Sequence, residues 1–183
     1  GFYRPFKAVT PFTETIGADN LPRGAVSGVN PGDDVFMYAG TNNNGTGGLW
    51  ELQSDGSWTD VSRSAGYSMT QTGCWDFARF GDNIIAVSCS LNPQRFEMGV
   101  STTFEDLGGS PPAGRSVKVL RDQVFISGLS SDPTKIVWSA LNDITGWTEG
   151  VDQAGAQTFP DVGECHGVYG ANVGYVFFDR AIY

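Results

Sequence analysis

A short phrase that occurs three times along the chain limits the possible folds more than any other feature of the sequence. Residues 32–38 (GDDVFMY), 81–87 (GDNIIAV) and 121–127 (RDQVFIS) each place a polar, acid-containing turn before a run rich in β-branched and aromatic residues. A weaker fourth copy covers residues 170–178 (GANVGYVFF). The copies recur at intervals of 49, 40 and 52 residues, near the repeat length of propeller blades. The sequence therefore predicts a repeat protein.

The residues around each copy repeat too, so the unit is larger than one turn and one strand. Candidate strands precede the later copies, as in residues 75–80 and 116–120. The first copy is followed by an apolar strand at 49–52, a polar turn at 54–57 and an aromatic residue trailed by an acid at 58–61. The same order follows the second and third copies. Each unit thus contains four strands joined in sequence.

We predict an all-β, β-propeller-like fold with repeated antiparallel four-stranded meanders of 40–52 residues, as part of a larger propeller. One meander cannot bury both of its faces, whereas meanders stacked radially cover one another and leave only short edges. The alternative is a twisted β-sandwich, which also has turn signals about every 8 to 12 residues. A sandwich gives no reason for one aromatic residue and one turn to recur in register, which favours the propeller.

The repeated residues have expected structural roles. The acid of the phrase is assigned to the turn, because Asp side chains bind nearby backbone groups. A catalytic acid would occur once, not once per blade. The turn positions are Asp34, Asp82 and Asp122. The core between blades is expected to consist largely of the recurring aromatic residues, namely Phe36, Trp50, Trp58, Phe96, Phe104, Phe125, Trp138 and Trp147.

The repeats also predict the domain organisation. Residues 1–31 carry no copy of the phrase and contain four prolines, so they are expected to form an irregular N-terminal segment. Within it, residues 25–29 fit either the last strand of a preceding unit or the first strand of this one. Residues 32–183 hold about three and a half blades. Since a propeller has at least about four, the chain is expected to be a fragment of a longer polypeptide.

The charge of the chain argues against nucleic-acid binding. Its net charge is −9, whereas proteins that bind phosphate backbones concentrate Lys and Arg on one face. Arg115, Lys118 and Arg121 lie close together in the sequence, and we interpret them as a solvated strand face. No apolar run approaches the roughly 18 residues of a transmembrane helix, so no membrane helix is predicted.

The cysteines and the histidine do not form a recognisable catalytic or metal-binding pattern. Cys74, Cys89 and Cys165 include no CxxC pair, and we predict buried free thiols in a chain made in a reducing compartment. The single histidine, His166, follows Cys165 directly. Neighbouring residues on an extended strand point to opposite faces, so these two side chains should not form a nucleophile–base pair.

Pairs of acidic residues suggest glycosidase carboxylates or a calcium site at first sight. They are Asp33 with Asp34, Glu105 with Asp106, and Asp60 with Glu51. Their recurrence in each unit favours roles in turns and at strand ends instead. No catalytic, metal-binding or cofactor-binding residue is predicted, and the chain is not expected to be an enzyme.

Residues 54–58 (SDGSW) weakly resemble the Asp-box turn of sialidases and related propellers. The spacing of that turn is shortened here, and no arginine triad or paired tyrosine and glutamate of sialidases can be assigned. The resemblance implies an alternative function, a carbohydrate-binding or glycan-cleaving β-propeller that acts in receptor recognition.

A more extensive resemblance is to tail proteins of tailed bacteriophages. Residues 135–147 (KIVWSALNDITGW), 157–163 (QTFPDVG) and 174–183 (GYVFFDRAIY) carry it, within a similarity that covers about residues 32–183. The chain is similar in particular to the propeller-bearing hub or nozzle proteins of short-tailed phages, which include packaged-DNA stabilisation proteins. Val162 departs from the family, which often has glycine at that position.

This resemblance implies a non-enzymatic structural component of a virion tail, in the hub, the nozzle or the head-to-tail connector. Such a protein assembles in the host cytoplasm into a ring of its own copies, around the DNA channel or on its outer surface. Its other partners would be neighbouring tail, portal or adaptor proteins, and it would need no cofactor. DNA would pass without specific binding, because an acidic lumen repels the phosphate backbone.

Overall fold

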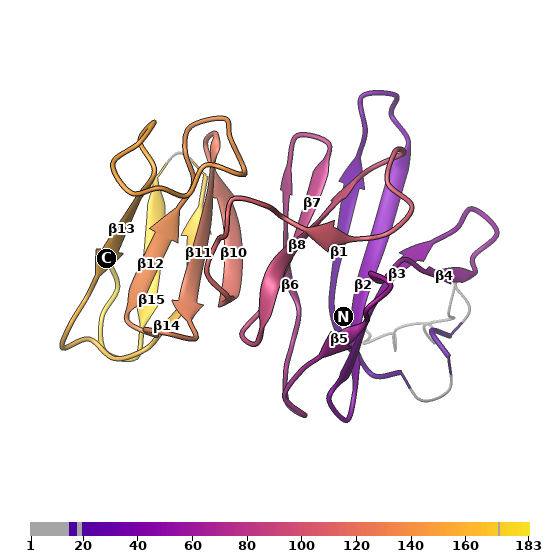
Figure 1. Cartoon of the computed structure of the whole chain (residues 1–183), viewed down its shortest axis with the longest axis horizontal. Helices are drawn as coiled ribbons and strands as arrows, with labels where there is room; N and C mark the ends of the chain where they lie inside the picture. Colours follow the sequence, from indigo (N-terminus) through magenta and orange to yellow (C-terminus); the bar gives the residue numbers. More distant parts are fainter. Residues whose placement is uncertain (1–14, 18–19, 172) are drawn as a thin grey trace, which may run out of the picture.

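The chain folds into antiparallel β-sheets (Figure 1). The computed structural model describes residues 15–17, 20–171 and 173–183. Within these residues the regular elements are fifteen strands and no helix. The predicted all-β class is therefore confirmed.

Three of the four sheets are meanders, in which consecutive strands are neighbours, as predicted. Sheet 1 contains β1 (Pro22–Val29), β2 (Val35–Asn43), β3 (Thr46–Leu52) and β4 (Trp58–Asp60), with the short β5 (Tyr67–Ser68) beside β3. Sheet 2 contains β6 (Asp76–Phe80), β7 (Asn83–Ser88), β8 (Leu91–Glu97) and β9 (Glu105–Asp106). Sheet 3 contains β10 (Gly114–Leu120), β11 (Gln123–Leu129), β12 (Lys135–Trp138) and β13 (Gly155–Thr158). Sheet 4 is the hairpin of β14 (Cys165–Gly170) and β15 (Gly174–Phe178).

The N-terminal boundary of the first unit differs from the prediction. The irregular segment expected for residues 1–31 is wrong for Pro22–Val29, because these residues form β1 and pair along their length with β2. Of the two interpretations of residues 25–29, the structure supports the first strand of the first unit. Residues 1–14 lie outside the described part of the chain.

The repeated phrase forms the first hairpin turn of a sheet and the strand that follows. In sheets 2 and 3, the pairs Phe80–Asn83 and Leu120–Gln123 close two-residue loops. The first loop residue has a positive φ in both, +57° at Gly81 and +53° in the other loop. Asp82 and Asp122 occupy the second loop position.

In sheet 1 the corresponding turn is longer and is held by an asparagine. The side chain of Asn30 accepts a hydrogen bond from the backbone N–H of Asp34 (2.9 Å) and donates one to the Asp34 carboxylate (3.2 Å). Asp34, like Asp82 and Asp122, thus lies between the first and second strands of its sheet.

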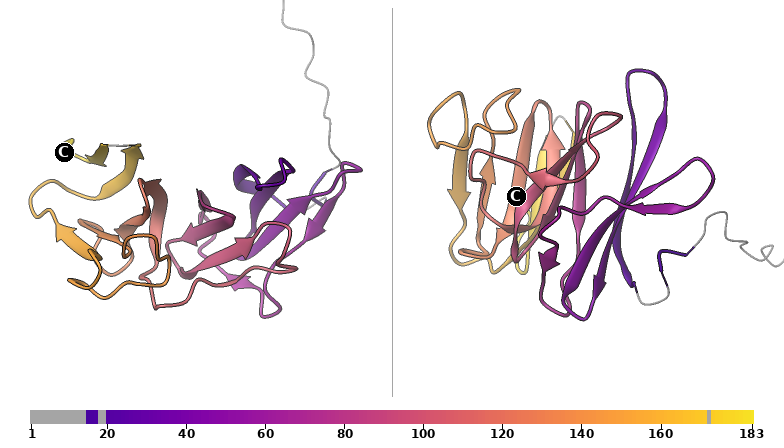
Figure 2. Two further views of the ribbon diagram at one scale, coloured as in Figure 1. Left: turned by 90° about the horizontal axis from the view of Figure 1, so that it is seen from above. Right: turned by 45° about the vertical axis from the view of Figure 1, so that its right-hand side comes forward.

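The sheets follow one another along an open arc (Figure 2). The first strands are neighbours in series, because β1 contacts β6, β6 contacts β10, and β10 contacts β14. The fourth strands lie farther along each meander and are short, with 3, 2 and 4 residues in β4, β9 and β13. Sheets 1 and 4 form the two ends of the arc.

The second strand of each middle sheet is buried on both of its faces. In β7, Ile84 and Ala86 belong to the core cluster shared with sheet 1, whereas Ile85 and Val87 belong to the cluster shared with sheet 3. Alternate side chains of a strand point to opposite faces. This two-sided burial explains why the strand reads as an unbroken apolar run rather than as alternating apolar and polar residues.

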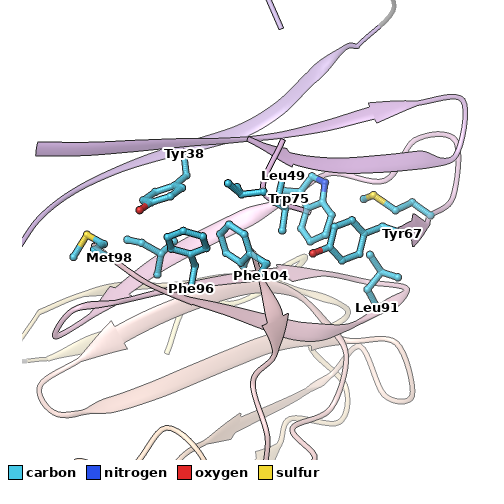
Figure 3. Packing of buried hydrophobic residues seen from close by; sticks show 12 residues of the cluster. Tyr38, Leu49, Tyr67, Trp75, Leu91, Phe96, Met98 and Phe104 are labelled. Carbon is cyan, nitrogen blue, oxygen red and sulfur yellow. The ribbon is translucent and has the colours of Figure 1, made fainter. Parts of the chain in front are cut away.

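Aromatic side chains fill the junction between sheets 1 and 2 (Figure 3). Tyr38 from β2 lies against Phe96 and Phe104, with ring centroids 5.1 and 6.0 Å away, and the two phenylalanines are 5.0 Å apart. All three side chains are fully buried. A backbone hydrogen bond from Phe104 to Val61 (2.7 Å) joins the sheets directly. This junction therefore combines apolar burial with a main-chain link.

The eight aromatic residues predicted as core occupy three kinds of position. Phe96 and Phe104 are fully buried, and Phe36, Phe125, Trp138 and Trp147 are half-buried against the core clusters. The prediction is wrong for Trp50 and Trp58, which belong to no cluster. Trp50 alternates with the buried Leu49, so its side chain lies on the other face of sheet 1.

Each junction between sheets also carries a polar link. Arg63 binds Asp106 (2.9 Å) between sheets 1 and 2, and Arg115 binds Glu164 (3.3 Å) between sheets 3 and 4. At the middle junction, the carboxylate of Asp76 in β6 accepts hydrogen bonds from the hydroxyl of Ser116 (2.7 Å) and the backbone N–H of the next residue in β10 (2.9 Å). These links fix the offset between neighbouring sheets in the direction of their strands.

We expect that Phe104→Ala destabilises the protein by about 3 to 5 kcal/mol, because it removes a fully buried ring from the first junction. Urea unfolding measures the change. The matched control is Val100→Ala, at a position that is 70% exposed, where the change should stay within about 0.5 kcal/mol. Equal effects of the two substitutions would contradict the packing of this junction.

Stability should also fall in acid, and Asp106 should contribute to that fall. Hydrogen bonding, chiefly from the buried Gln94 amide (2.6 Å), lowers the pKa of Asp106 below its ordinary value of 3.8. A carboxyl with a lowered folded-state pKa stabilises the protein above the unfolded-state value, and this stabilisation is lost as the pH falls through the folded-state pKa. Asp106→Asn should therefore lower the free energy of unfolding at pH 7, and the difference from wild type should shrink below about pH 4. A difference that is independent of pH would contradict this role.

Candidate interaction surfaces at the two ends of the arc

Each sheet has one face toward the C-terminal end of the arc and one face toward the N-terminal end. At each junction, the C-terminal-side face of one sheet packs on the N-terminal-side face of the next sheet. We call the face toward the C-terminal end the trailing face of a sheet, and the face toward the N-terminal end its leading face. In β11, Val124 and Ile126 lie on the leading face, in the cluster shared with sheet 2, and Phe125 packs on the trailing side against sheet 4. Within the described residues, the leading face of sheet 1 and the trailing face of sheet 4 have no neighbouring sheet.

The leading face of sheet 1 is apolar, and it is exposed at the Val29–Val35 end of the β1–β2 pair, whereas Ala39 farther along β2 is buried. In β2, Phe36 and Tyr38 pack toward sheet 2, which leaves Val35, Met37 and Ala39 on the leading side. Val35 is 72% exposed, and its cross-strand partner Val29 in β1 is also exposed. The β2 strand thus has apolar residues on both faces, like the second strands of the middle sheets, but within the described residues another sheet covers only one of them.

A hollow of about 680 Å³ lies on this leading face. Met37, Ala39 and Ala25 line it from β1 and β2, and Trp58 lines it from the short β4 strand. Residues 15–17 and 20, in the segment before β1, also line it. Trp50 lies directly opposite Ala39 in β3, and its indole N–H donates to the hydroxyl of Thr41 (3.0 Å). The two tryptophans that are absent from the core clusters are half-buried, and both lie on the leading side of sheet 1.

The trailing face of sheet 4 is aromatic. Val176 and Phe178 of β15 are buried toward sheet 3, and Tyr175 and Phe177 point the other way. Tyr175 is 54% exposed, Phe177 36% and Tyr169 of β14 56%. The rings of Tyr169 and Phe177 meet edge to face, with centroids 5.4 Å apart. Such contiguous exposed aromatic surface is typical of a protein–protein contact.

A glycine shapes this aromatic surface. A Cβ atom at position 167 would lie only 3.0 Å from the ring of Tyr169. Gly167 therefore lets the Tyr169 ring lie close over the β14 backbone, beside Phe177, which is opposite Gly167 in the hairpin. Tyr169 and Tyr175 are not core residues, and the sequence analysis did not single them out as surface residues. The apolar run at residues 174–178 is the sequence signal that indicated a strand with two apolar faces.

The single histidine forms a hydrogen bond with a carboxylate on the surface. Nε2 of His166 is 2.6 Å from the carboxylate of Asp179, whose other oxygen accepts the backbone N–H of Glu164 (2.9 Å). Hydrogen bonding, first from that backbone N–H and then from His166, lowers the pKa of Asp179. Cys165 is fully buried on the other side of β14, so its predicted separation from His166 is confirmed.

The acidic pairs singled out in the sequence are bound locally. Glu105 pairs with Arg95 (2.6 Å), while Asp106 pairs with Arg63 as described above. Glu51 accepts the hydroxyl of Tyr38 (2.9 Å), and burial of that tyrosine raises its pKa. Asp60 accepts the backbone N–H two residues on (2.9 Å). In the described residues, no three Asp, Glu, Cys or His side chains come together as a possible metal site.

The Asp-box-like turn is one example of a recurring aspartate turn. Oδ1 of Asp55 accepts both the backbone N–H and the hydroxyl of Ser57, at 2.9 and 2.7 Å. Asp132 and Asp143 bind the threonine two residues on in the same way. Hydrogen bonding from the Ser57 hydroxyl lowers the pKa of Asp55. The aspartates that bind nearby backbone in this manner, Asp55, Asp132 and Asp143, are therefore not the aspartates of the repeated phrase.

Comparison of the sequence with protein-family models and with curated proteins found no match. The surfaces of the molecule are therefore the basis for a functional proposal. In the described part of the chain, no helix has the length and apolar character needed to cross a membrane.

Proposed function

We propose that the chain is a non-enzymatic structural component of a phage virion tail, and that it assembles through the leading face of sheet 1 and the trailing face of sheet 4. The observation that carries the proposal is the pair of exposed apolar faces at opposite ends of one series of sheets. The resemblance to tail hub and nozzle proteins, which covers about residues 32–183, supports the same conclusion.

The arrangement we propose is part of a β-propeller. Three four-stranded meanders, first strands in contact along the series and an open arc of sheets all support it. A propeller covers every sheet face by radial repetition. The two terminal faces must then be covered by further sheets of the same kind.

The proposed occupant is a second copy of this chain. Every junction inside the molecule joins a trailing face to a leading face, so the trailing face of one copy is matched to the leading face of another. Such a head-to-tail contact is heterologous and produces a ring when the rotation between copies closes. The ring would surround the DNA channel or form its outer wall, in contact with neighbouring tail, portal or adaptor proteins.

The charge of the molecule suits a channel that DNA passes through without binding. A net charge of −9 repels the phosphate backbone. The proposed location is the virion, after assembly in the host cytoplasm, and the proposed role requires no cofactor.

Two single substitutions test the head-to-tail contact. Met37→Glu places a charge on the leading face, and Tyr175→Glu places one on the trailing face. Wild type should self-associate with increasing concentration in sedimentation velocity, and each variant alone should remain a monomer. An equimolar mixture should form a heterodimer and nothing larger, because only one matched junction survives.

Circular dichroism of each variant serves as the control for folding, since both side chains lie outside the core clusters. Val100→Glu, at a 70% exposed site away from both faces, should associate like wild type. A monomeric wild type at all concentrations, or a mixture of the two variants that stays monomeric, would exclude a second copy as the partner.

The alternative function, a carbohydrate-binding or glycan-cleaving (sialidase-like) propeller, is favoured by one observation. Trp58 lines the hollow on the leading face, and tryptophan rings at the rim of a pocket are suited to stacking on sugars. A glycan array with wild type and Trp58→Ala decides between the functions. Specific binding that the substitution abolishes supports the alternative, and no binding to any glycan supports the structural role.

A further inference from the structure

The cysteines do not have the environment predicted from the sequence. Cys165 is buried, but Cys74 is exposed and Cys89 is half-buried, so the prediction of buried thiols is wrong for these two. The reason is their place in the fold. Cys74 lies in the loop before β6, and Cys89 lies in the turn between β7 and β8.

The β6–β7 hairpin brings Cys74 and Cys89 together. The last residue pair of this hairpin is Asp76 with Val87. Cys74 lies two residues before Asp76 and Cys89 two residues after Val87, so both lie just beyond the same paired end of the hairpin. A disulfide spans Cα atoms roughly 4.4 to 6.8 Å apart, so the bond proposed below requires the two cysteines to approach within this range. Both cysteines line one hollow of about 410 Å³.

The loop that carries Cys74 is held in place by a buried side chain. The amide of Asn42, in β2 of sheet 1, is fully buried and donates to the backbone carbonyls of Thr70 (2.9 Å) and Gly73 (2.8 Å). The following residue, Trp75, donates its backbone N–H to the carbonyl of Arg23 in β1 (3.0 Å). The segment that carries Cys74 is therefore held in place beside the β6–β7 hairpin.

A cation from the next sheet completes the hollow. Arg115 of β10 lines it together with the two cysteines. A hydrogen bond with the side chain of Cys89 is the largest cause that raises the pKa of Arg115. The side chain of Arg115 therefore lies beside that of Cys89, and the thiolate is the reactive form of cysteine. Arg115 also binds Glu164 (3.3 Å), so its charge is partly compensated.

We propose that Cys74 and Cys89 form a reversible disulfide by exchange with a low-molecular-weight disulfide. The Cys89 thiolate attacks one sulfur of the small disulfide, whose S–S bond breaks and releases one thiolate. The Cys74 thiolate then attacks the Cys89 sulfur and releases the second small thiol. The protein loses two hydrogen atoms in total, and the small disulfide gains them. The new bond ties the loop between sheets 1 and 2 to the β7–β8 turn.

The test is oxidation of the reduced, full chain with oxidised glutathione, followed by intact-mass measurement and peptide mapping. The expected product has lost two hydrogen atoms, keeps one free thiol at Cys165, and yields one peptide pair linked through Cys74 and Cys89. Cys165→Ser should give the same link. Cys74→Ser should stop at a glutathione adduct on Cys89, because the resolving thiol is missing.

Substitution of Arg115 tests its effect on the rate of disulfide formation, which a purely structural role of this residue would not change. Arg115→Gln should slow disulfide formation several-fold without changing the product, whereas Arg95→Gln, which removes another arginine–glutamate pair, should leave the rate unchanged. In wild type, stable glutathione adducts on both cysteines, links between two molecules, a link to Cys165, or no reaction would each overturn the proposal.

Discussion

The alternation of side chains along the second strand of each sheet is the constraint on which the rest of the structure depends. In β7, successive residues enter two different core clusters, one shared with sheet 1 and one with sheet 3. A shift of register by one residue would exchange the two sets between junctions. The two-residue turn at residues 81–82 fixes that register, because it leaves no spare residue between β6 and β7. A short turn therefore determines how three sheets pack together.

The junctions differ in composition although they share one geometry. Aromatic rings dominate the first, around Tyr38 and Phe104, whereas the second consists mainly of Val, Ile and Leu. The polar links at the junctions are partly exposed, so each contributes little to stability. Their orientation matters more. The Asp76 carboxylate binds a hydroxyl and a backbone N–H of β10 together, which permits only one alignment of the two strands.

Much of the local structure could be predicted from the sequence, because strands and two-residue turns depend on nearby residues. The meanders and the turns at Asp82 and Asp122 are of this kind. The face occupied by each aromatic residue was harder to predict, since Trp50 and Leu49 differ by a single position along β3. Only the start of β1 was missed, because Pro22 and Gly24 disfavour a regular strand, and a register shift between them accommodates both.

The candidate surfaces could not be predicted from the sequence for a different reason. An apolar run such as residues 174–178 has the same pattern whether a neighbouring sheet covers one of its faces or both. Only the spatial order of the sheets distinguishes the two cases. The proximity of Cys74 and Cys89 was likewise hidden, because it depends on how the chain continues beyond the last paired residues of β6 and β7.

The short fourth strands, β4, β9 and β13, have a consequence for the way the molecule can grow. A free strand edge is a template for pairing with any other chain, and long flat edges lead to aggregation. Here those edges offer only 2 to 4 residues of backbone, and the first strands lie against one another inside the arc. Backbone pairing with another chain at the rim is thereby limited. Side-chain contact between sheet faces then remains as the main way in which another copy can be added. The short edges thus suit the proposed head-to-tail addition of copies along the arc better than addition at the rim.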